Sequence, residues 1–244
     1  MLNILIPMAG LGSRFANAGY EKPKPFIDVA GKPMIARVME NLQVEGARFI
    51  LVVQREHLEK EADLVKTIQK KYNVQFVPID GLTEGAACTV LRAQDCINSA
   101  HPLMIANSDQ IVDIKISDFV RDAQDRNLDG SILCFWDKTR DPKWSFAKTD
   151  SNGFVTEVRE KQAISALATV GIYYFQSGRD FVNAAREMIK LDDRVNGEFY
   201  TCPAYNYLIQ NKLAIGVYLL SPSQMHGLGT PEDLQIFIQG GALK

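Results

Sequence analysis

Short apolar strands alternate with helices along the first half of the chain, and this alternation constrains the fold more than any other feature. Four runs have the length of buried strands, at residues 2–6, 48–53, 74–77 and 103–106. Residues 33–42 begin with a proline suited to a first helical turn, and residues 56–71 carry apolar side chains at helical spacing. The pattern predicts an α/β fold: an open, mainly parallel sheet with helices on both faces.

The second half is more mixed. Four further runs read as strands, at residues 131–136, 145–149, 154–158 and 168–175, with a turn at residues 151–153. They predict a small insertion of antiparallel strands. Two helices are expected at 179–190 and 198–211, then a strand at 214–219 and a terminal helix from Pro231. No linker interrupts the 244 residues, which predicts one domain.

Charge and hydropathy exclude several classes of partner. The 27 Lys and Arg residues nearly balance 29 Asp and Glu residues, so no basic field attracts nucleic acid or an anionic membrane. The apolar runs fall far short of the ~20 residues that span a bilayer. The first residues lack the features of a secretory leader, which leads us to expect a cytoplasmic protein. Four scattered cysteines and three histidines argue against a structural zinc site.

A glycine-rich turn follows the first strand, in the run Ala9, Gly10, Leu11, Gly12, Ser13. Glycines after a parallel strand let backbone N–H groups approach a phosphate at the edge of the sheet where ligands bind. The run lacks the third glycine of a dinucleotide fingerprint and the Gly-Lys-Ser/Thr of a Walker A loop. It is a candidate phosphate loop, and a tight turn without a ligand is the alternative.

Two basic residues accompany this loop. Arg14 follows it directly, and Lys24 stands between Pro23 and Pro25. Prolines on both sides disfavour helix, so we expect an extended segment that presents the Lys24 ammonium close to the loop. Together the two side chains form a candidate cationic clamp for phosphates.

These elements, followed by Gly-Lys-Pro-Met at residues 31–34, resemble the sugar-phosphate nucleotidyltransferases. The resemblance implies a Rossmann-like, GT-A-like fold in which about residues 1–130 bind a nucleoside triphosphate and about 131–230 bind a phosphorylated acceptor. It implies that Ala9 to Ser13 contact the nucleotide. It also implies catalytic roles for Arg14, on the leaving β,γ-phosphates, and for Lys24, on the α-phosphate and the acceptor.

Two further segments of the first half resemble the family. Residues 81–87 resemble its base-contacting loop, which implies that Asp80 and Gly85 face the base. Residues 106–110 resemble its strand-end Gly-Asp, with Ser108 in place of the glycine, which implies that Asp109 binds Mg²⁺. A turn or helix-capping aspartate is the alternative for Asp109.

Matches in the second half imply the acceptor contacts. Glu160 and Lys161 would bind hydroxyls and phosphate, Gly171 would leave room for the acceptor, and Glu198 would add a further contact. A solvated Glu-Lys pair on a strand edge is the alternative for the first two. The closing segment at 229–233 departs from the family, since many members have an aspartate where this chain has Gly227. The departure weakens the metal assignment, and the neighbouring His226 is a further candidate for the site.

The implied reaction is attack by an acceptor phosphate oxygen on the α-phosphorus of a nucleoside triphosphate, which expels pyrophosphate and makes an activated precursor for surface polysaccharide. The nucleophile is already anionic, so positioning and charge neutralisation suffice. A glycosyltransferase is one alternative, although the spacing from Asp109 to Asp113 does not match its Asp-x-Asp metal motif. A catalytically idle nucleotide-binding relative is another, against which Arg14 and Lys24 argue. The sequence specifies neither base nor acceptor, and it is compatible with a homo-oligomer.

Overall fold

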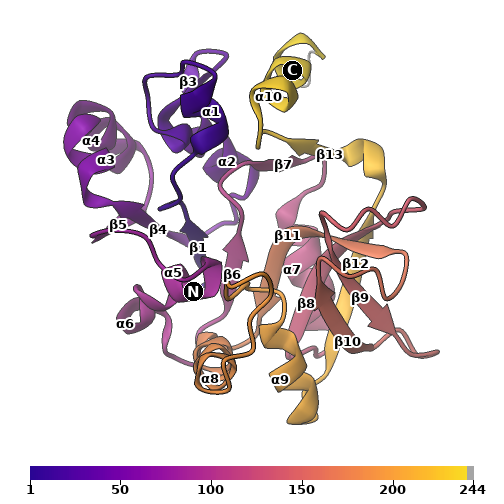
Figure 1. Ribbon diagram of the computed structural model, residues 1–244. Helices are drawn as coiled ribbons and strands as arrows, with labels where there is room; N and C mark the ends of the chain where they lie inside the picture. Colours follow the sequence, from indigo (N-terminus) through magenta and orange to yellow (C-terminus); the bar gives the residue numbers. More distant parts are fainter. Residues whose placement is uncertain (241–244) are drawn as a thin grey trace.

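One nine-stranded sheet runs through the molecule in the computed structural model, which describes residues 1–240 (Figure 1). Four parallel strands form its first half, in the spatial order β6, β1, β4, β5. They are β1 (Asn3–Pro7), β4 (Arg48–Gln54), β5 (Val74–Ile79) and β6 (Leu103–Ala106). These strands confirm the expected parallel sheet, and their carboxyl ends meet at one edge.

The second half extends the same sheet with antiparallel strands. They are β8 (Gly130–Trp136), β9 (Ser145–Thr149), β10 (Val155–Glu160) and β11 (Leu167–Phe175), and β12 (Ile215–Leu220) joins β8 in parallel. β11 pairs with β6, β8 and β9, all in antiparallel direction. The antiparallel strands are therefore continuous with the parallel ones, and the predicted insertion is not a separate sheet.

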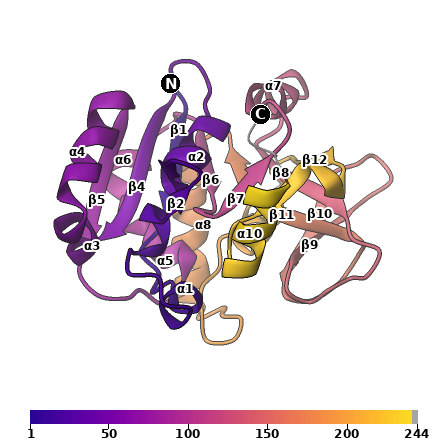
Figure 2. The same ribbon diagram turned by 90° about the horizontal axis from the view of Figure 1, so that it is seen from above.

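Helices cover both faces, as expected (Figure 2). On one face the apolar core packs against α2 (Met34–Asn41), α4 (Ala62–Lys71), α7 (Ile116–Asp125) and α10 (Pro231–Gln239). On the other it packs against α5 (Ala86–Leu91), α6 (Gln94–Ile97), α8 (Gly178–Lys190) and α9 (Ala204–Gln210). Within β1, Ile4 and Ile6 face the first core and Leu5 the second, which explains why this strand is an unbroken apolar run.

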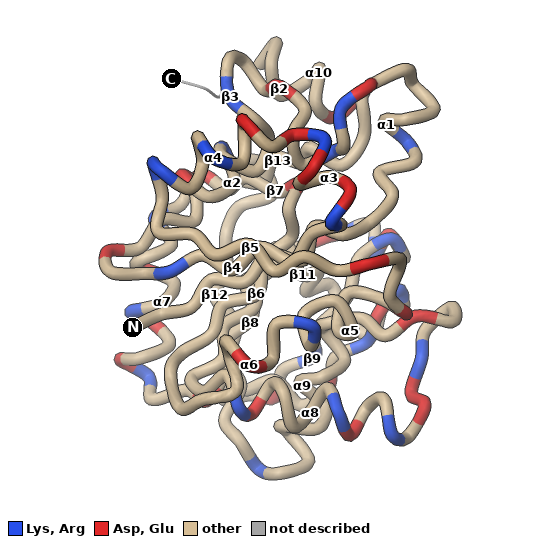
Figure 3. The backbone as a smooth tube through the Cα atoms, turned by 90° about the vertical axis from the view of Figure 1, so that its left-hand side faces the viewer, with Lys and Arg blue, Asp and Glu red and all other residues tan. Residues whose placement is uncertain are grey.

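Short elements complete the fold around the sheet edge. They are α1 (Ser13–Asn17), α3 (Arg55–Lys60), the 3₁₀ turns η1 (Lys24–Phe26) and η2 (Pro222–Gln224), and the strand pairs β2 (Asp28–Val29) with β3 (Lys32–Pro33) and β7 (Gln110–Val112) with β13 (Met225–Gly227). None of the helices within residues 1–240 is long and apolar enough to span a membrane. On the side seen in Figure 3, basic and acidic residues are interspersed.

Three sequence expectations were wrong in detail. The helix expected at 56–71 is two helices, α3 and α4, which meet at Glu61. The segment around Lys24 is not extended but opens the turn η1, because a proline is tolerated in a first helical turn. The helix expected from 198 begins only at Ala204, since Glu198 pairs with Val195 in an isolated bridge.

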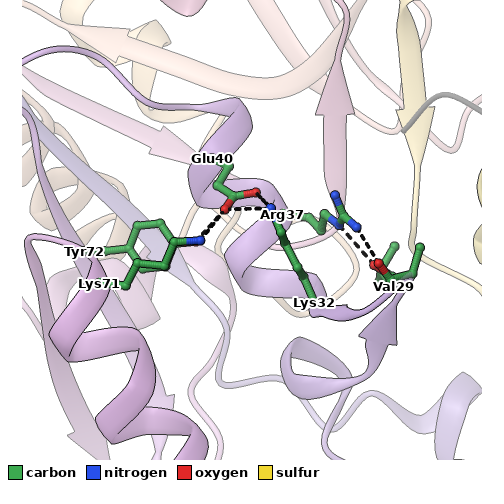
Figure 4. A network of polar contacts seen from close by, with 7 residues as sticks. Val29, Lys32, Arg37, Glu40, Lys71 and Tyr72 are labelled. Carbon is green, nitrogen blue, oxygen red and sulfur yellow. Dashed lines mark hydrogen bonds and ion pairs between the residues drawn. The ribbon is translucent and has the colours of Figure 1, made fainter. Parts of the chain in front are cut away.

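A network of polar contacts anchors the segment that follows the Lys24 turn (Figure 4). The Lys32 ammonium donates to both oxygens of Glu40 at 3.0 and 2.7 Å, and Lys71 and the Tyr72 hydroxyl donate to Glu40 Oε1 at 2.9 and 2.7 Å. Arg37 of α2 donates to the carbonyl of Val29 at 3.0 Å. The lysine of the Gly-Lys-Pro-Met segment is therefore held in a structural network.

Glu40→Gln is expected to lower the melting temperature at pH 7 by several degrees. Burial raises the pKa of Glu40, but its hydrogen bonds with Lys32, Lys71 and Tyr72 outweigh burial and lower the pKa from 4.5 to about 2. A carboxylate with a depressed pKa stabilises the fold above its unfolded pKa, and this stabilisation disappears as the pH falls towards 2. A loss of ~1–2 kcal/mol corresponds to ~2–8 °C in a chain of this size.

Thermal unfolding of the wild type and of Glu40→Gln at pH 7 and pH 3 measures this effect. The difference between their melting temperatures should be smaller at pH 3. Glu45→Gln, which changes an exposed carboxylate, should have the melting temperature of the wild type at both pH values. A gap that is equal at both pH values would contradict the role of the Glu40 charge.

Candidate functional site

The glycine-rich turn lines a cavity of about 520 Å³ at the carboxyl end of β1. All five predicted residues of the run, Ala9 to Ser13, contribute to its lining. Gly12 has φ +62°, and a Cβ there would lie 2.9 Å from the Cβ of Lys24. Glycine is therefore required at this position both by the backbone conformation and by the close approach of the Lys24 turn.

Gln54, which sequence reasoning missed, ties this loop to the neighbouring one. Its side chain lies at the end of β4 and donates to the carbonyl oxygens of Ala9 at 2.8 Å and Gly81 at 2.9 Å. A polar residue that ends a buried parallel strand was the available signal. One amide thus fixes the spacing of two loops that flank the cavity.

Gly85 also lines the cavity. Because it has no side chain, the backbone of the distant residue Phe199 can pack directly against it. A Cβ on Gly85 would lie 2.4 Å from the carbonyl oxygen of Phe199, whose N–H donates to the Glu84 carbonyl at 2.8 Å. This docking brings Glu198 to the wall of the same cavity. Glu198 therefore lines the cavity of the glycine loop, and it also lies near enough to Glu160 and Lys161 to influence their pKa values.

Asp80 lies apart from the other predicted residues. Its carboxylate accepts hydrogen bonds from Arg55 at 2.8 and 3.2 Å and is not part of the cavity lining. The hydrogen bond with Arg55 is the main cause of the lowered pKa of Asp80. The Asp80 side chain is thus paired with Arg55 on the surface, and its contact with a base stays a prediction.

The two predicted cations border a smaller cavity of about 250 Å³. Arg14, Lys24 and Gly229 line it together with Gly12 and Ser13, which it shares with the first cavity. Arg14 is exposed, whereas the Lys24 side chain is only 18% exposed. The structure therefore brings both members of the predicted clamp to one side of the glycine loop.

Asp109 receives the Lys24 ammonium as a hydrogen-bond donor and ion-pair partner. It follows β6, and its carboxylate lines the first cavity. Within the described chain no three His, Cys, Asp or Glu residues are grouped closely enough to hold a metal by themselves. Mg²⁺ commonly uses one or two carboxylates and completes its shell with water and phosphates. Asp109 fits that donor set, and its carboxylate is paired with the Lys24 ammonium.

A cavity of about 310 Å³ adjoins the first and contains the other predicted acceptor residues, Glu160, Lys161 and Gly171. Burial is the main cause of the raised pKa of Glu160, which accepts a hydrogen bond from the Ser145 hydroxyl. Glu160 is therefore buried and hydrogen-bonded, whereas the alternative interpretation expected a solvated carboxylate on a strand edge.

Lys161 is held by an aromatic residue that the sequence did not single out. Its ammonium lies 2.6 Å from the Tyr200 hydroxyl oxygen and 4.6 Å from the centre of the ring. The hydrogen bond with Tyr200 is the main cause of the raised pKa of Lys161, which therefore stays charged at neutral pH. Lys143 and Trp144 add a second cation and ring, with the ammonium 4.9 Å from the ring centre.

The resemblance implied that Gly171 leaves room for the acceptor, whereas its nearest neighbour in the structure is a side chain of the protein. The space that a side chain would occupy there is filled by the carboxamide of Asn107, which the sequence analysis did not consider. Asn107 and Ala86 line both the first cavity and this one. The two cavities therefore adjoin at these residues.

The candidates near the closing segment lie to the side. His226 Nε2 is 2.7 Å from the Asp113 carboxylate, and the ring lies 5.7 Å from that of Phe237. A Cβ on Gly227 would lie 3.8 Å from the carboxylate of Asp233. Neither His226 nor Gly227 lines one of the three cavities.

Comparison with known proteins gives consistent matches. A family model described as nucleotidyl transferase matches residues 4–207. The chain is 28% identical over 180 residues to a mannose-1-phosphate guanylyltransferase catalytic subunit beta of Drosophila melanogaster, covering 70% of this chain and 47% of that one. It is 25% identical over 241 residues to a UTP–glucose-1-phosphate uridylyltransferase of Haloferax volcanii, covering 95% and 93%.

Among solved structures, a nucleoside-diphosphate-sugar pyrophosphorylase of Vibrio cholerae superposes with a TM-score of 0.81 at 26% identity, covering 97% of this chain and 99% of that one. A Bacillus anthracis protein described as an unproven glucose-1-phosphate thymidylyltransferase shares the fold, with a TM-score of 0.78 at 18% identity. The match covers 100% of this chain and 95% of that one. The chain spans about half or less of the length of several relatives, such as the Drosophila one and a fission-yeast one covered to 37%.

Proposed function

The chain belongs to the nucleotidyl transferase family, and from that premise we propose that it joins a nucleoside triphosphate to a phosphorylated sugar, or a related phosphorylated small molecule, with release of pyrophosphate. The observation that carries this proposal is the pair of adjoining cavities. One is built on a glycine loop beside two cations, and the other holds a buried carboxylate and a paired lysine. A reaction that joins two phosphorylated substrates needs two such neighbouring compartments.

Positively charged side chains carry the proposed catalysis. Arg14 would neutralise the β,γ-phosphates that leave as pyrophosphate, and Lys24 would contact the α-phosphate at which the new bond forms. An acceptor phosphate is an anion at neutral pH, so the reaction needs no base to activate it. Preorganised cations that face the developing charge lower the barrier because they need not reorganise during the reaction.

Two further groups complete the proposed site. Asp109 would hold Mg²⁺, and when bound the ion would neutralise phosphate charge and orient the triphosphate. Glu160 would accept hydrogen bonds from acceptor hydroxyls while Lys161 pairs with an anionic group of the acceptor. The loop residues Ala9 to Ser13 would offer backbone N–H groups to the nucleotide, and Gly85 of the same cavity would face the base. Glu198 would add a contact with the acceptor.

We propose the cytoplasm as the compartment, because a nucleoside triphosphate is one of the two substrates. The product would be an activated precursor for a surface polysaccharide. In support, one Haloferax volcanii relative, 25% identical and covering 96% of this chain and 66% of its own length, is named as a nucleotidyltransferase of low-salt glycan biosynthesis.

A pyrophosphate-release screen tests the proposed function. Each of ATP, CTP, GTP and UTP is combined with glucose 1-phosphate, mannose 1-phosphate, glycerol 3-phosphate or no acceptor, in the presence of Mg²⁺. We expect release only when both substrates are present, and release that is about 100-fold slower with Lys24→Ala as the matched protein control. Transfer of sugar from a nucleotide sugar without pyrophosphate would favour a glycosyltransferase. Nucleotide binding without any release would favour an idle relative.

A further inference from the structure

Asn107 occupies the boundary between the two compartments. It is the first residue after β6, its side chain is exposed to the cavities, and it lines both of them. The other residue that lines both is Ala86, which has no polar side-chain atom. Asn107 thus supplies the side-chain hydrogen-bonding group at the place where two substrates would meet.

The neighbouring strand β11 bonds the backbone of Asn107 and packs against its carboxamide. β11 runs antiparallel to β6, and the N–H of Asn107 donates to the carbonyl of Gly171 at 3.0 Å. A Cβ on Gly171 would lie 2.2 Å from Asn107 Nδ2 and 2.8 Å from its Cγ. Any larger residue at Gly171 would displace the amide. The Asn107 backbone is therefore bonded to β11 and its carboxamide packs against Gly171, which positions the side chain as a preorganised contact requires.

The hydrogen-bonding groups of the Asn107 side chain are available to a ligand. A carboxamide carries two N–H donors and one acceptor oxygen, and no hydrogen bond links this carboxamide to another residue among 1–240. Cations are already present at each cavity: Lys161 lines one, and Lys24 is paired with Asp109, which lines the other. Asn107 can therefore orient an oxyanion at the junction of the two cavities without adding charge.

We propose that the Asn107 carboxamide donates a hydrogen bond to the phosphate of the acceptor and holds it in line with the α-phosphorus of the nucleotide. The inference rests on the proposed function and adds a residue to it. Gly171, in this arrangement, serves the acceptor indirectly, because its missing side chain makes room for the amide that binds the phosphate. Orientation of the reacting groups is a large contribution to such reactions.

Asn107→Asp and Asn107→Ala test this inference. Aspartate has the same shape and fits beside Gly171, but it replaces N–H donors with a negative oxygen that repels phosphate. We expect kcat/KM for the acceptor to fall ~100-fold or more with aspartate and ~10-fold with alanine, as for a lost hydrogen bond to a charged group. The KM for the nucleoside triphosphate should stay within about twofold. The constants are measured with whichever of glucose 1-phosphate, mannose 1-phosphate or glycerol 3-phosphate gives the fastest release.

Asn152→Asp is the matched control, since Asn152 lies in the exposed turn between β9 and β10 and lines none of the cavities. It should change neither constant, and all variants should keep the wild-type melting temperature. An Asn107→Asp enzyme with an unchanged acceptor KM and kcat, or with a loss confined to the nucleotide KM, would overturn the inference while the proposed function stands. If Asn107→Asp fails to fold, Asn107→Ala carries the same comparison. A wild type that releases no pyrophosphate overturns the proposed function itself, and the inference with it.

Discussion

Lys24→Ala is expected to lower kcat about 100-fold, whereas Lys22→Ala two residues earlier should lower it less than about threefold. The Lys24 side chain is 18% exposed, and its ammonium lies on the Asp109 carboxylate beside the glycine loop. The Lys22 side chain is 53% exposed and its ammonium lies 3.8 Å from the Glu61 carboxylate, a long ion pair with an exposed lysine that contributes little. A positioned cation on a transferring phosphoryl group contributes about 3 kcal/mol, which is about two orders of magnitude in rate.

Steady-state pyrophosphate release by the two variants measures this difference. Lys24 also lies over the Phe15 ring, 5.9 Å from its centre, so alanine removes packing as well as charge. Lys24→Met keeps most of that packing and should lose as much activity as Lys24→Ala. Equal losses from Lys22 and Lys24, or a Lys24→Met enzyme close to the wild type, would show that the charge of Lys24 does not act on the reacting phosphate.

The parallel half of the fold could be predicted because its strands are buried on both faces. Ile4 and Leu5 face opposite cores, so β1 appears in the sequence as an unbroken apolar run. The helix α7 was missed although Ile116, Phe119 and Val120 lie at helical spacing on its buried side. These apolar residues are spaced as in a helix, so α7 could have been predicted from the sequence.

Other elements depend on contacts between distant residues and have no local signal. β7 and β13 are three residues long and pair Ile111 with His226. The late start of α9 follows from the docking of Phe199 on Glu84, which holds residues before Ala204 out of the helix. Tertiary contacts of this kind override local propensity.

The candidate site also has one part that could be predicted from the sequence and another that could not. Glycines, lysines and aspartates with a fixed order along the chain could be located from the sequence, because their spacing is a local property. Their partners could not, since the Lys24 and Asp109 pair spans 85 positions and Asp80 pairs with Arg55 at the start of α3. The fit of Asn107 against Gly171 required the register between β6 and β11.

Asp109→Asn is expected to lower kcat by at least tenfold and to raise the Mg²⁺ concentration for half-maximal rate by a similar factor. Asparagine keeps the shape of the side chain, and the backbone bond from the Leu228 N–H to the Asp109 carbonyl at 2.7 Å is retained. A Cβ on Gly229 would lie 3.1 Å from Asp109 Oδ2, so Gly229 leaves the room that this side chain occupies, and asparagine has the same size. The variant should therefore fold, and the missing charge should be the only change.

The Mg²⁺ dependence of pyrophosphate release separates this role from a structural one. Asp113→Asn is the control, because Asp113 lies four residues further along, pairs with His226 and lines none of the cavities. It should leave the Mg²⁺ requirement unchanged. The melting temperature of Asp109→Asn will also reflect the lost ion pair with Lys24, so the metal requirement is the deciding measurement. Full activity of Asp109→Asn at low Mg²⁺, or wild-type activity in a chelator, would contradict a site built on a single carboxylate, and Asp233, the carboxylate nearest Gly227, would then be the next residue to replace.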